Sequence, residues 1–134
     1  MPNLVVPLLK FAAESHFLTL IHGDARLDNW YFDDKTGEPG TFDFQQACKG
    51  PCYIDVAWCL TNSFPDNFYY EHRQTLLELY WSSLIKKLRD KGVDVSSLHF
   101  EDFLFGYNLF NIFGLGKSIL AVDALLSSTD TVGP

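Results

Sequence analysis

The strongest constraint on the fold is the long segment 65–92, whose apolar side chains recur at intervals of three and four residues. That spacing places them on one face of an α-helix and leaves polar and charged residues on the others. Pro65 suits the first turn, and Gly92 suits a stop after the last turn. The apolar stripe consists of Leu76, Leu77, Tyr80, Leu84 and Leu88. Segments 53–62 and 96–126 also predict helices, so the chain is expected to be mostly helical.

A short β-hairpin is predicted ahead of these helices. The stretches NWYFD and TFDF flank the sequence DKTGEP, whose glycine and proline suit a turn. Asn29 is expected to begin the first strand, and Asp43 is expected to lie in the second. The predicted fold class is therefore α+β, mostly α, with a short hairpin followed by helices.

A hairpin centred near residue 37 also predicts where its side chains point. Asp43 would lie opposite roughly Tyr31, which places Asn29 about 7 Å further along the partner strand. Because side chains alternate along a strand, Phe42 and Phe44 would occupy the face opposite Asp43 and be buried.

The remaining segments indicate a single domain. Residues 4–20 are predicted as a helix or an apolar segment interrupted by Pro7. The domain is expected to span residues 1–126, and the tail 127–134 is expected to fray. No internal repeat or linker marks a second domain.

Charge and cysteine content exclude several classes of protein. A net charge of −7 argues against nucleic-acid binding, which depends on clustered Lys and Arg. The three cysteines form no regular disulfide framework, and CKGPC lacks the second ligand pair that a zinc site needs. No segment is typical of a signal peptide or of a membrane span, so a cytoplasmic protein is expected.

An ordered set of polar residues runs through the first part of the chain. Asp24, in the sequence HGD, is followed five residues later by Asn29 and fourteen residues after that by Asp43. The catalytic loop of kinases has this order. Phosphoryl transfer needs one carboxylate at the acceptor hydroxyl, and it needs an amide oxygen and a second carboxylate to hold Mg²⁺.

The segments HGDARLDN, FDFQ and YIDVAW resemble the catalytic core of the aminoglycoside phosphotransferase and choline kinase-like superfamily, including its ecdysteroid kinase-like (CHK kinase-like) branch. The resemblance is sharpest over residues 20–62 and extends as compatible helices to about residue 126. It implies a protein-kinase-like C-terminal lobe that uses ATP and Mg²⁺ to phosphorylate the hydroxyl of a small molecule.

The resemblance also implies roles for individual residues. Asp24 corresponds to the catalytic base, and Asn29 and Asp43 correspond to the ligands of Mg²⁺ and the nucleotide. Asp55 and His22 correspond to residues that support the catalytic loop. Asp28 and Arg26 remain open as a further metal ligand and a phosphate contact, or as ordinary surface charges.

Three departures from protein kinases limit the resemblance. Gly23 replaces the Arg that would pair with a phosphorylated activation loop, and Gln45 stands where protein kinases place the Gly of DFG. A Gly-rich phosphate loop and a strand Lys do not precede residue 20. The N-terminal nucleotide lobe is therefore expected to be missing, and the isolated chain is expected to be inactive.

Two rival functions remain open at this point. A kinase lobe without its nucleotide lobe would serve as a non-catalytic binding or interaction module, and an acidic metal phosphoesterase would need further ligands. The aromatic residues Phe68, Tyr69, Tyr70 and Trp81 are expected either to pack in the core or to line an acceptor pocket. Self-association is expected through apolar surface near residues 4–9 and around the hairpin.

Overall fold

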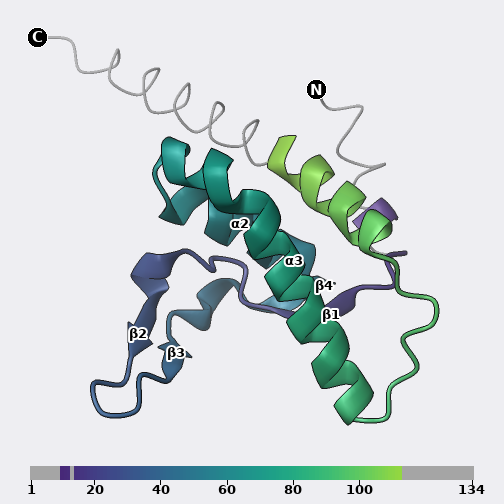
Figure 1. Cartoon of the computed structure of the whole chain (residues 1–134), viewed down its shortest axis with the longest axis horizontal. Helices are drawn as coiled ribbons and strands as arrows, with labels where there is room; N and C mark the ends of the chain where they lie inside the picture. Colours follow the sequence, from purple (N-terminus) through teal and green to yellow (C-terminus); the bar gives the residue numbers. More distant parts are fainter. Residues whose placement is uncertain (1–9, 13, 113–134) are drawn as a thin grey trace, which may run out of the picture.

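The computed structural model describes residues 10–12 and 14–112 (Figure 1). It contains two antiparallel strand pairs and three long helical segments, so the α+β and mostly helical class is confirmed. The first pair joins β1 (Leu18–Ile21) to β4 (Cys48–Pro51), with Leu18 opposite Pro51 and Ile21 opposite Cys48. This pairing brings the two ends of segment 22–47 side by side.

The second strand pair is the predicted hairpin within that segment. β2 (Trp30–Phe32) pairs with β3 (Pro39–Thr41), and Tyr31 lies opposite Gly40. At the turn, Oδ1 of Asp33 accepts hydrogen bonds from the backbone N–H groups of Lys35 and Thr36. These bonds order the connection, residues 33–38, between two very short strands.

The hairpin is shorter than expected, and its register differs. Asn29 ends the short 3₁₀ helix Leu27–Asn29 instead of beginning the strand, and Asp43 follows β3 instead of lying within it. The expected pairing of Asp43 with Tyr31 is therefore wrong. The expected burial of Phe42 and Phe44 is also wrong, because these side chains are 48% and 53% exposed. The alternation argument fails because the chain leaves the strand geometry after Thr41.

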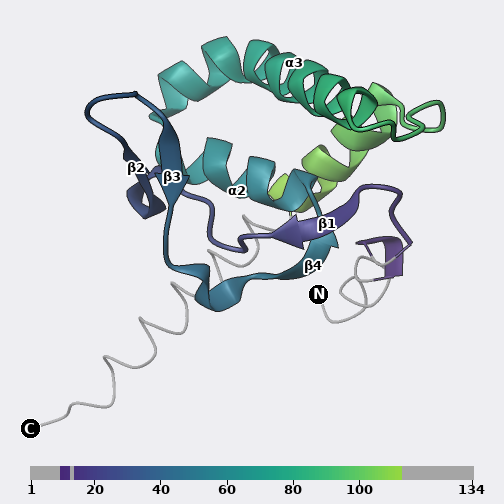
Figure 2. The ribbon, with the colours of Figure 1, turned by 90° about the horizontal axis from the view of Figure 1, so that it is seen from below.

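Three helices complete the described fold. Helix α2 (Tyr53–Ser63) and helix α3 (Asp66–Asp90) confirm the two helices predicted there, although Pro65 precedes α3 instead of occupying its first turn. Residues 100–112 form a further helix, and the rest of the predicted segment 96–126 and the tail 127–134 lie outside the described residues. Figure 2 shows α2 between α3 and the β1–β4 pair, so α2 is the central element.

The core forms where these helices meet. Tyr53 of α2, Leu77 of α3 and Phe103 and Tyr107 of the last helix are almost completely buried. The last helix packs closely against α2 at Gly106, because this residue has no Cβ atom. A Cβ atom there would lie 2.5 Å from the Tyr53 ring. α2 is thus fixed on more than one side by aromatic packing.

Of the two alternatives predicted for residues 4–20, a continuous helix is wrong. Residues 10–12 are helical, but residues 18–21 form strand β1 instead of continuing a helix to residue 20. Pairing with β4 decides this conformation, and the apolar run alone does not reveal such a distant partner. Residues 4–9 lie outside the described part of the chain. In that described part, no helix is both long and apolar enough to cross a membrane.

Candidate functional site

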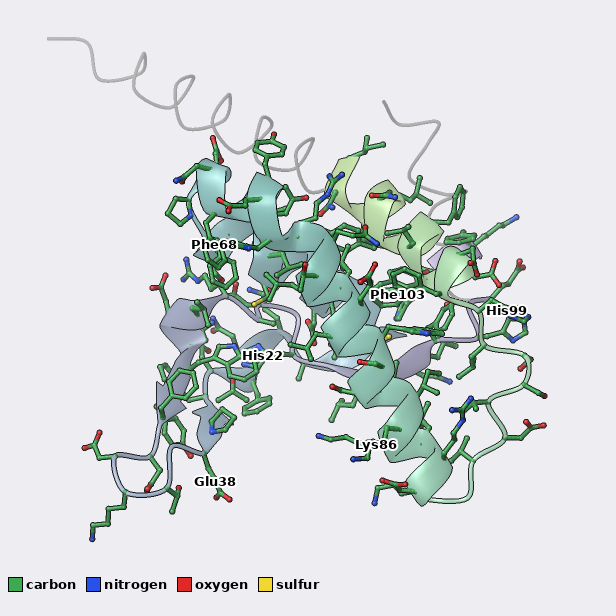
Figure 3. All side chains as sticks on the ribbon, in the orientation of Figure 1. His22, Glu38, Phe68, Lys86, His99 and Phe103 are labelled. Carbon is green, nitrogen blue, oxygen red and sulfur yellow. The ribbon has the colours of Figure 1, made fainter. Side chains whose placement is uncertain are left out.

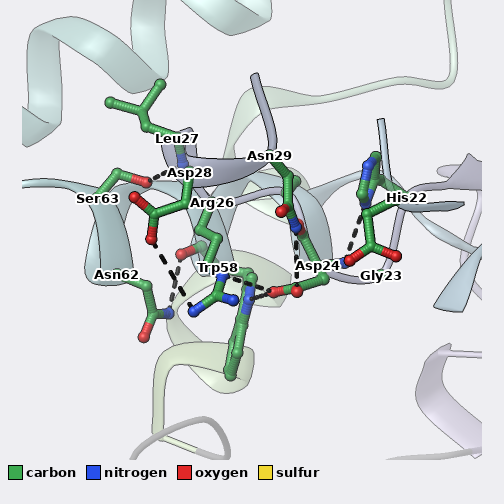
Figure 4. A network of polar contacts seen from close by, with 12 residues as sticks. His22, Gly23, Asp24, Arg26, Leu27, Asp28, Asn29, Trp58, Asn62 and Ser63 are labelled. Atoms are coloured by element: carbon green, nitrogen blue, oxygen red, sulfur yellow. Dashed lines mark hydrogen bonds and ion pairs between the residues drawn. The ribbon is translucent and has the colours of Figure 1, made fainter. Parts of the chain in front are cut away.

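Helix α2 holds the backbone of the loop that follows β1. The two carboxylate oxygens of Asp55 accept hydrogen bonds from the backbone N–H groups of His22, at 2.7 Å, and Gly23, at 2.9 Å. Further along the loop, the N–H of Leu27 donates to Oγ of Ser63 at 2.9 Å (Figure 4). Because these acceptors lie at the two ends of one helix, the loop is fixed at both of its ends.

His22 joins the loop to the end of the hairpin. Its Nε2 lies 2.8 Å from the carbonyl oxygen of Phe42, and its Nδ1 lies 3.3 Å from the backbone N–H of Asp24. Since a carbonyl only accepts and a backbone N–H only donates, the proton belongs on Nε2. The ring also packs on Phe44, with 4.7 Å between ring centroids. Figure 3 shows His22 at the base of the hairpin and Glu38 at its far end.

Asp24 and Asn29 meet side chain to side chain. The Asn29 amide nitrogen donates to the Asp24 carbonyl oxygen at 2.8 Å and to Asp24 Oδ2 at 3.1 Å. Both residues are buried among the described residues, at 8% and 5% exposure. These two contacts orient the amide group, so its oxygen, Oδ1, points away from Asp24. Within the described structure, no group donates a hydrogen bond to that oxygen, which leaves it available to a cation.

Two further groups approach the other oxygen of the Asp24 carboxylate. The indole N–H of Trp58 donates to Oδ1 at 2.7 Å, and Nε of Arg26 lies 3.6 Å from the same atom. The Arg26 guanidinium also lies 4.0 Å from the carboxylate of Asp28, which is 80% exposed. Arg26 is thus an ion-pair partner within the loop. This contact of Trp58 is not predicted from the sequence. The available signal is the position of Trp58 in YIDVAW, one helical turn after Asp55.

Asp43 is more exposed than Asp24 and Asn29. The backbone N–H of the preceding residue, Phe42, donates to the Asn29 carbonyl at 3.1 Å, so Asp43 follows directly after the residue paired with Asn29. Asp43 itself has a left-handed backbone, with φ of 64° and ψ of 57°. This conformation is uncommon for a residue other than Gly, although Asp tolerates it better than most. Its carboxylate receives one long contact, 3.4 Å from Nε2 of Gln45.

No zinc-type cluster accompanies these residues. In the described part of the chain, no three His, Cys, Asp or Glu side chains are grouped so that they could hold a metal ion. The predicted pair of Asn29 and Asp43 includes only one side chain of those types. Of the cysteines in CKGPC, Cys48 begins strand β4 and Cys52 follows it; both are free thiols, as is Cys59. Burial raises the pKa of Cys52 and of Cys59, so both thiols are less reactive than an exposed one.

A cavity of about 920 Å³ lies beside the loop, between β1, α2, α3 and the segment 93–98. Its walls are mainly apolar side chains, and His22 and Asp55 also line it. Asp24, Asn29 and Asp43 do not line it. This cavity therefore borders the loop, but the side chains of the three predicted site residues do not face it.

The aromatic residues singled out in the sequence do not form one cage. Trp81 packs in the core against Phe17 and Phe103, and the hydroxyl of Tyr69 lies 3.0 Å from that of Tyr107. Tyr70 is 74% exposed. Packing is thus the main use of this group. His16, His72 and His99 join no group of metal-ligating side chains in the part of the chain that the structure describes.

Comparison with known proteins identifies a family for this chain. The sequence model of the phosphotransferase enzyme family, abbreviated APH, matches residues 5–84. No curated protein and no solved structure gives a significant match. The match spans more than half of the chain and includes β1, the loop, the hairpin, α2 and most of α3. The chain therefore belongs to the phosphotransferase enzyme family.

Proposed function

We propose that this chain is the catalytic, C-terminal lobe of an ATP-dependent kinase that phosphorylates the hydroxyl of a small molecule. Within the superfamily, the segments HGDARLDN, FDFQ and YIDVAW favour the ecdysteroid kinase-like branch. The observation that carries the proposal is the contact between Asp24 and Asn29, on a loop anchored to α2, in a member of this family.

Asp24 is the residue proposed to act on the acceptor. Its carboxylate would accept the proton of the acceptor hydroxyl while the hydroxyl oxygen bonds to the γ-phosphorus of ATP and the bond from that phosphorus to the ADP oxygen breaks. The buried position of Asp24 limits competing water, and its contacts hold the carboxylate in one orientation. Positioning of this kind supplies much of the rate enhancement in phosphoryl transfer.

Asn29 and Asp43 are proposed to hold Mg²⁺. The free amide oxygen of Asn29 and the exposed carboxylate of Asp43 are the oxygen ligands that this ion prefers, and the backbone pairing of Asn29 with Phe42 keeps the two residues near each other. When bound, the ion would offset the negative charge of the nucleotide phosphates. His22 and Asp55 would support the loop through the hydrogen bonds described above.

The test compares variants in the longest product of the reading frame that contains this chain. Asp24→Asn is expected to keep nucleotide binding and to lower kcat by roughly 10²–10⁴, the scale of a positioned general base. Asp43→Ala is expected to weaken Mg²⁺-dependent ATP binding, measured by calorimetry with and without Mg²⁺. Asp34→Ala, in the exposed hairpin turn, is the control for loss of an acidic residue.

The outcomes separate a kinase from the non-catalytic module that the sequence also allowed. An unchanged kcat in Asp24→Asn removes Asp24 from the proposed role, and unaltered Mg²⁺ titration of Asp43→Ala removes Asp43 from the metal site. If the unsubstituted protein neither binds ATP nor transfers phosphate, the chain is a non-catalytic binding or interaction module instead.

A further inference from the structure

The catalytic loop contains a hydrogen bond whose donor comes from outside the loop. The indole N–H of Trp58, on α2, lies 2.7 Å from Oδ1 of Asp24 (Figure 4). We propose that Trp58 is a positioning residue that sets the orientation of the Asp24 carboxylate for reaction. This inference rests on the proposed catalytic role of Asp24.

An indole is well suited to this task. Its N–H is a donor only and does not titrate in the physiological range, so the contact has a single polarity at every working pH. A distance of 2.7 Å is at the short end for an N–H donor and is typical of a bond to a charged acceptor. Because the Asp24 side chain is only 12% exposed, few water molecules compete with this donor.

Helix α2 contacts both the backbone of the loop and the Asp24 side chain. Asp55 binds the N–H groups of His22 and Gly23, and Trp58 follows Asp55 by three residues, which places both on one face of α2. α2 lies at the centre of the packed core, with Tyr53, Val56 and Leu60 buried. The carboxylate is therefore positioned relative to a rigid element instead of by the flexible loop alone.

The contacts also distinguish the two carboxylate oxygens. Oδ1 receives the short bond from Trp58 and lies 3.6 Å from Arg26, whereas Oδ2 receives one longer bond, 3.1 Å from Asn29. Each oxygen therefore accepts one hydrogen bond and keeps a lone pair, but the Arg26 cation approaches only Oδ1, which leaves Oδ2 the better acceptor for a hydroxyl proton. In this arrangement Trp58 fixes Oδ1 so that Oδ2 faces the acceptor.

The first experiment detects the contact without using activity. In a ¹H–¹⁵N spectrum of residues 1–134, Trp58→Phe identifies the Trp58 indole signal among those of Trp30, Trp58 and Trp81. We expect that signal to lie downfield of an ordinary indole and to shift upfield in Asp24→Asn, while the Trp81 signal stays in place. A Trp58 signal that lies at the ordinary position and does not shift in Asp24→Asn overturns the proposal. This result does not require Trp58→Phe to be active.

The second experiment separates positioning from packing. In the protein used to test phosphotransfer, Trp58→Phe retains an aromatic ring but removes the donor, and we expect kcat to fall about tenfold with the KM values for ATP and acceptor unchanged. Trp81→Phe is the matched control: Trp81 packs in the core, and its indole N–H makes no hydrogen bond within the described structure. Equal kcat values in Trp58→Phe and the unsubstituted protein overturn the proposal.

The two proposals fail in different ways. If Asp24→Asn abolishes turnover but Trp58→Phe does not alter it, the catalytic role of Asp24 stands and the positioning role of Trp58 falls. If the unsubstituted protein shows no phosphotransfer, the proposed function falls, and the positioning role falls with it even where the indole signal demonstrates the contact.

Discussion

Asp55 is the residue on which the position of the loop most depends. Its two oxygens bind two adjacent backbone N–H groups, and no other described residue accepts a bond from either of them. Removal of the carboxylate would leave both donors without a protein partner inside a partly buried loop. Two donors left without acceptors lower the free energy of unfolding by more than an average hydrogen bond contributes to it.

Asp55→Ala is accordingly expected to lower the free energy of unfolding by about 2–4 kcal/mol, because two hydrogen bonds to a charged group disappear. Urea titration followed by circular dichroism measures the change. Asp33→Ala is the matched control, since Asp33 also accepts two backbone N–H bonds, but in an exposed turn where water replaces it. Equal destabilisation of the two variants would contradict the anchoring role of Asp55.

Among the elements, the loop between β1 and the hairpin has a strict steric limit at one glycine. Gly23 adopts a φ of +84°, and a Cβ atom there would lie 2.5 Å from the backbone carbonyl oxygen of Gln46. Both the backbone conformation and the close approach of residue 46 therefore require glycine. The absence of an Arg at this position, noted in the sequence, thus has a local structural cause as well.

Gly23→Ala is expected to destabilise the protein more than Gly37→Ala does. Gly37 also has a positive φ, of +71°, but a Cβ atom there would meet no other atom within 4 Å, so Ala adds only the cost of a left-handed backbone, about 1–2 kcal/mol. Ala at residue 23 adds a clash with a backbone atom that cannot rotate away. Thermal unfolding of the two variants provides the comparison, and a smaller loss of stability for Gly23→Ala would refute the steric argument.

At the scale of the whole molecule, apolar side chains are exposed around the hairpin and β1. Leu20, Tyr31 and Phe32 are 76%, 56% and 60% exposed, and Phe42 and Phe44 add to the same region of the chain. Aromatic residues so exposed in a small domain favour association with another apolar surface. Self-association therefore stays a prediction for this chain.

We expect the chain to form dimers or larger species as its concentration rises, because burial of apolar area contributes about 25 cal/mol per Å² before the cost of association. Sedimentation velocity across a wide concentration range measures this. Phe32→Ser, in the hairpin, is expected to weaken association, whereas Leu79→Ser is the control because Leu79 is 60% exposed on α3. A strictly monomeric protein at every concentration would show that the hairpin surface does not associate.

Much of the fold follows from local patterns in the sequence. The spacing of Leu76, Leu77, Tyr80, Leu84 and Leu88 predicts α3 because helical periodicity depends only on near neighbours. The order of Asp24, Asn29 and Asp43 places the first two in one loop because five residues cannot separate them far. Their chemical roles stay predictions.

What the sequence determined by itself is therefore local: the helices, the hairpin turn and the order of the polar residues on the loop. Tertiary structure alone decided the pairing of β1 with β4, the exposed position of Phe42 and Phe44, and the bond from Trp58 to Asp24. The physical reason is distance along the chain. Trp58 lies 34 residues after Asp24, and only the packing of α2 in the core brings its indole N–H to that carboxylate.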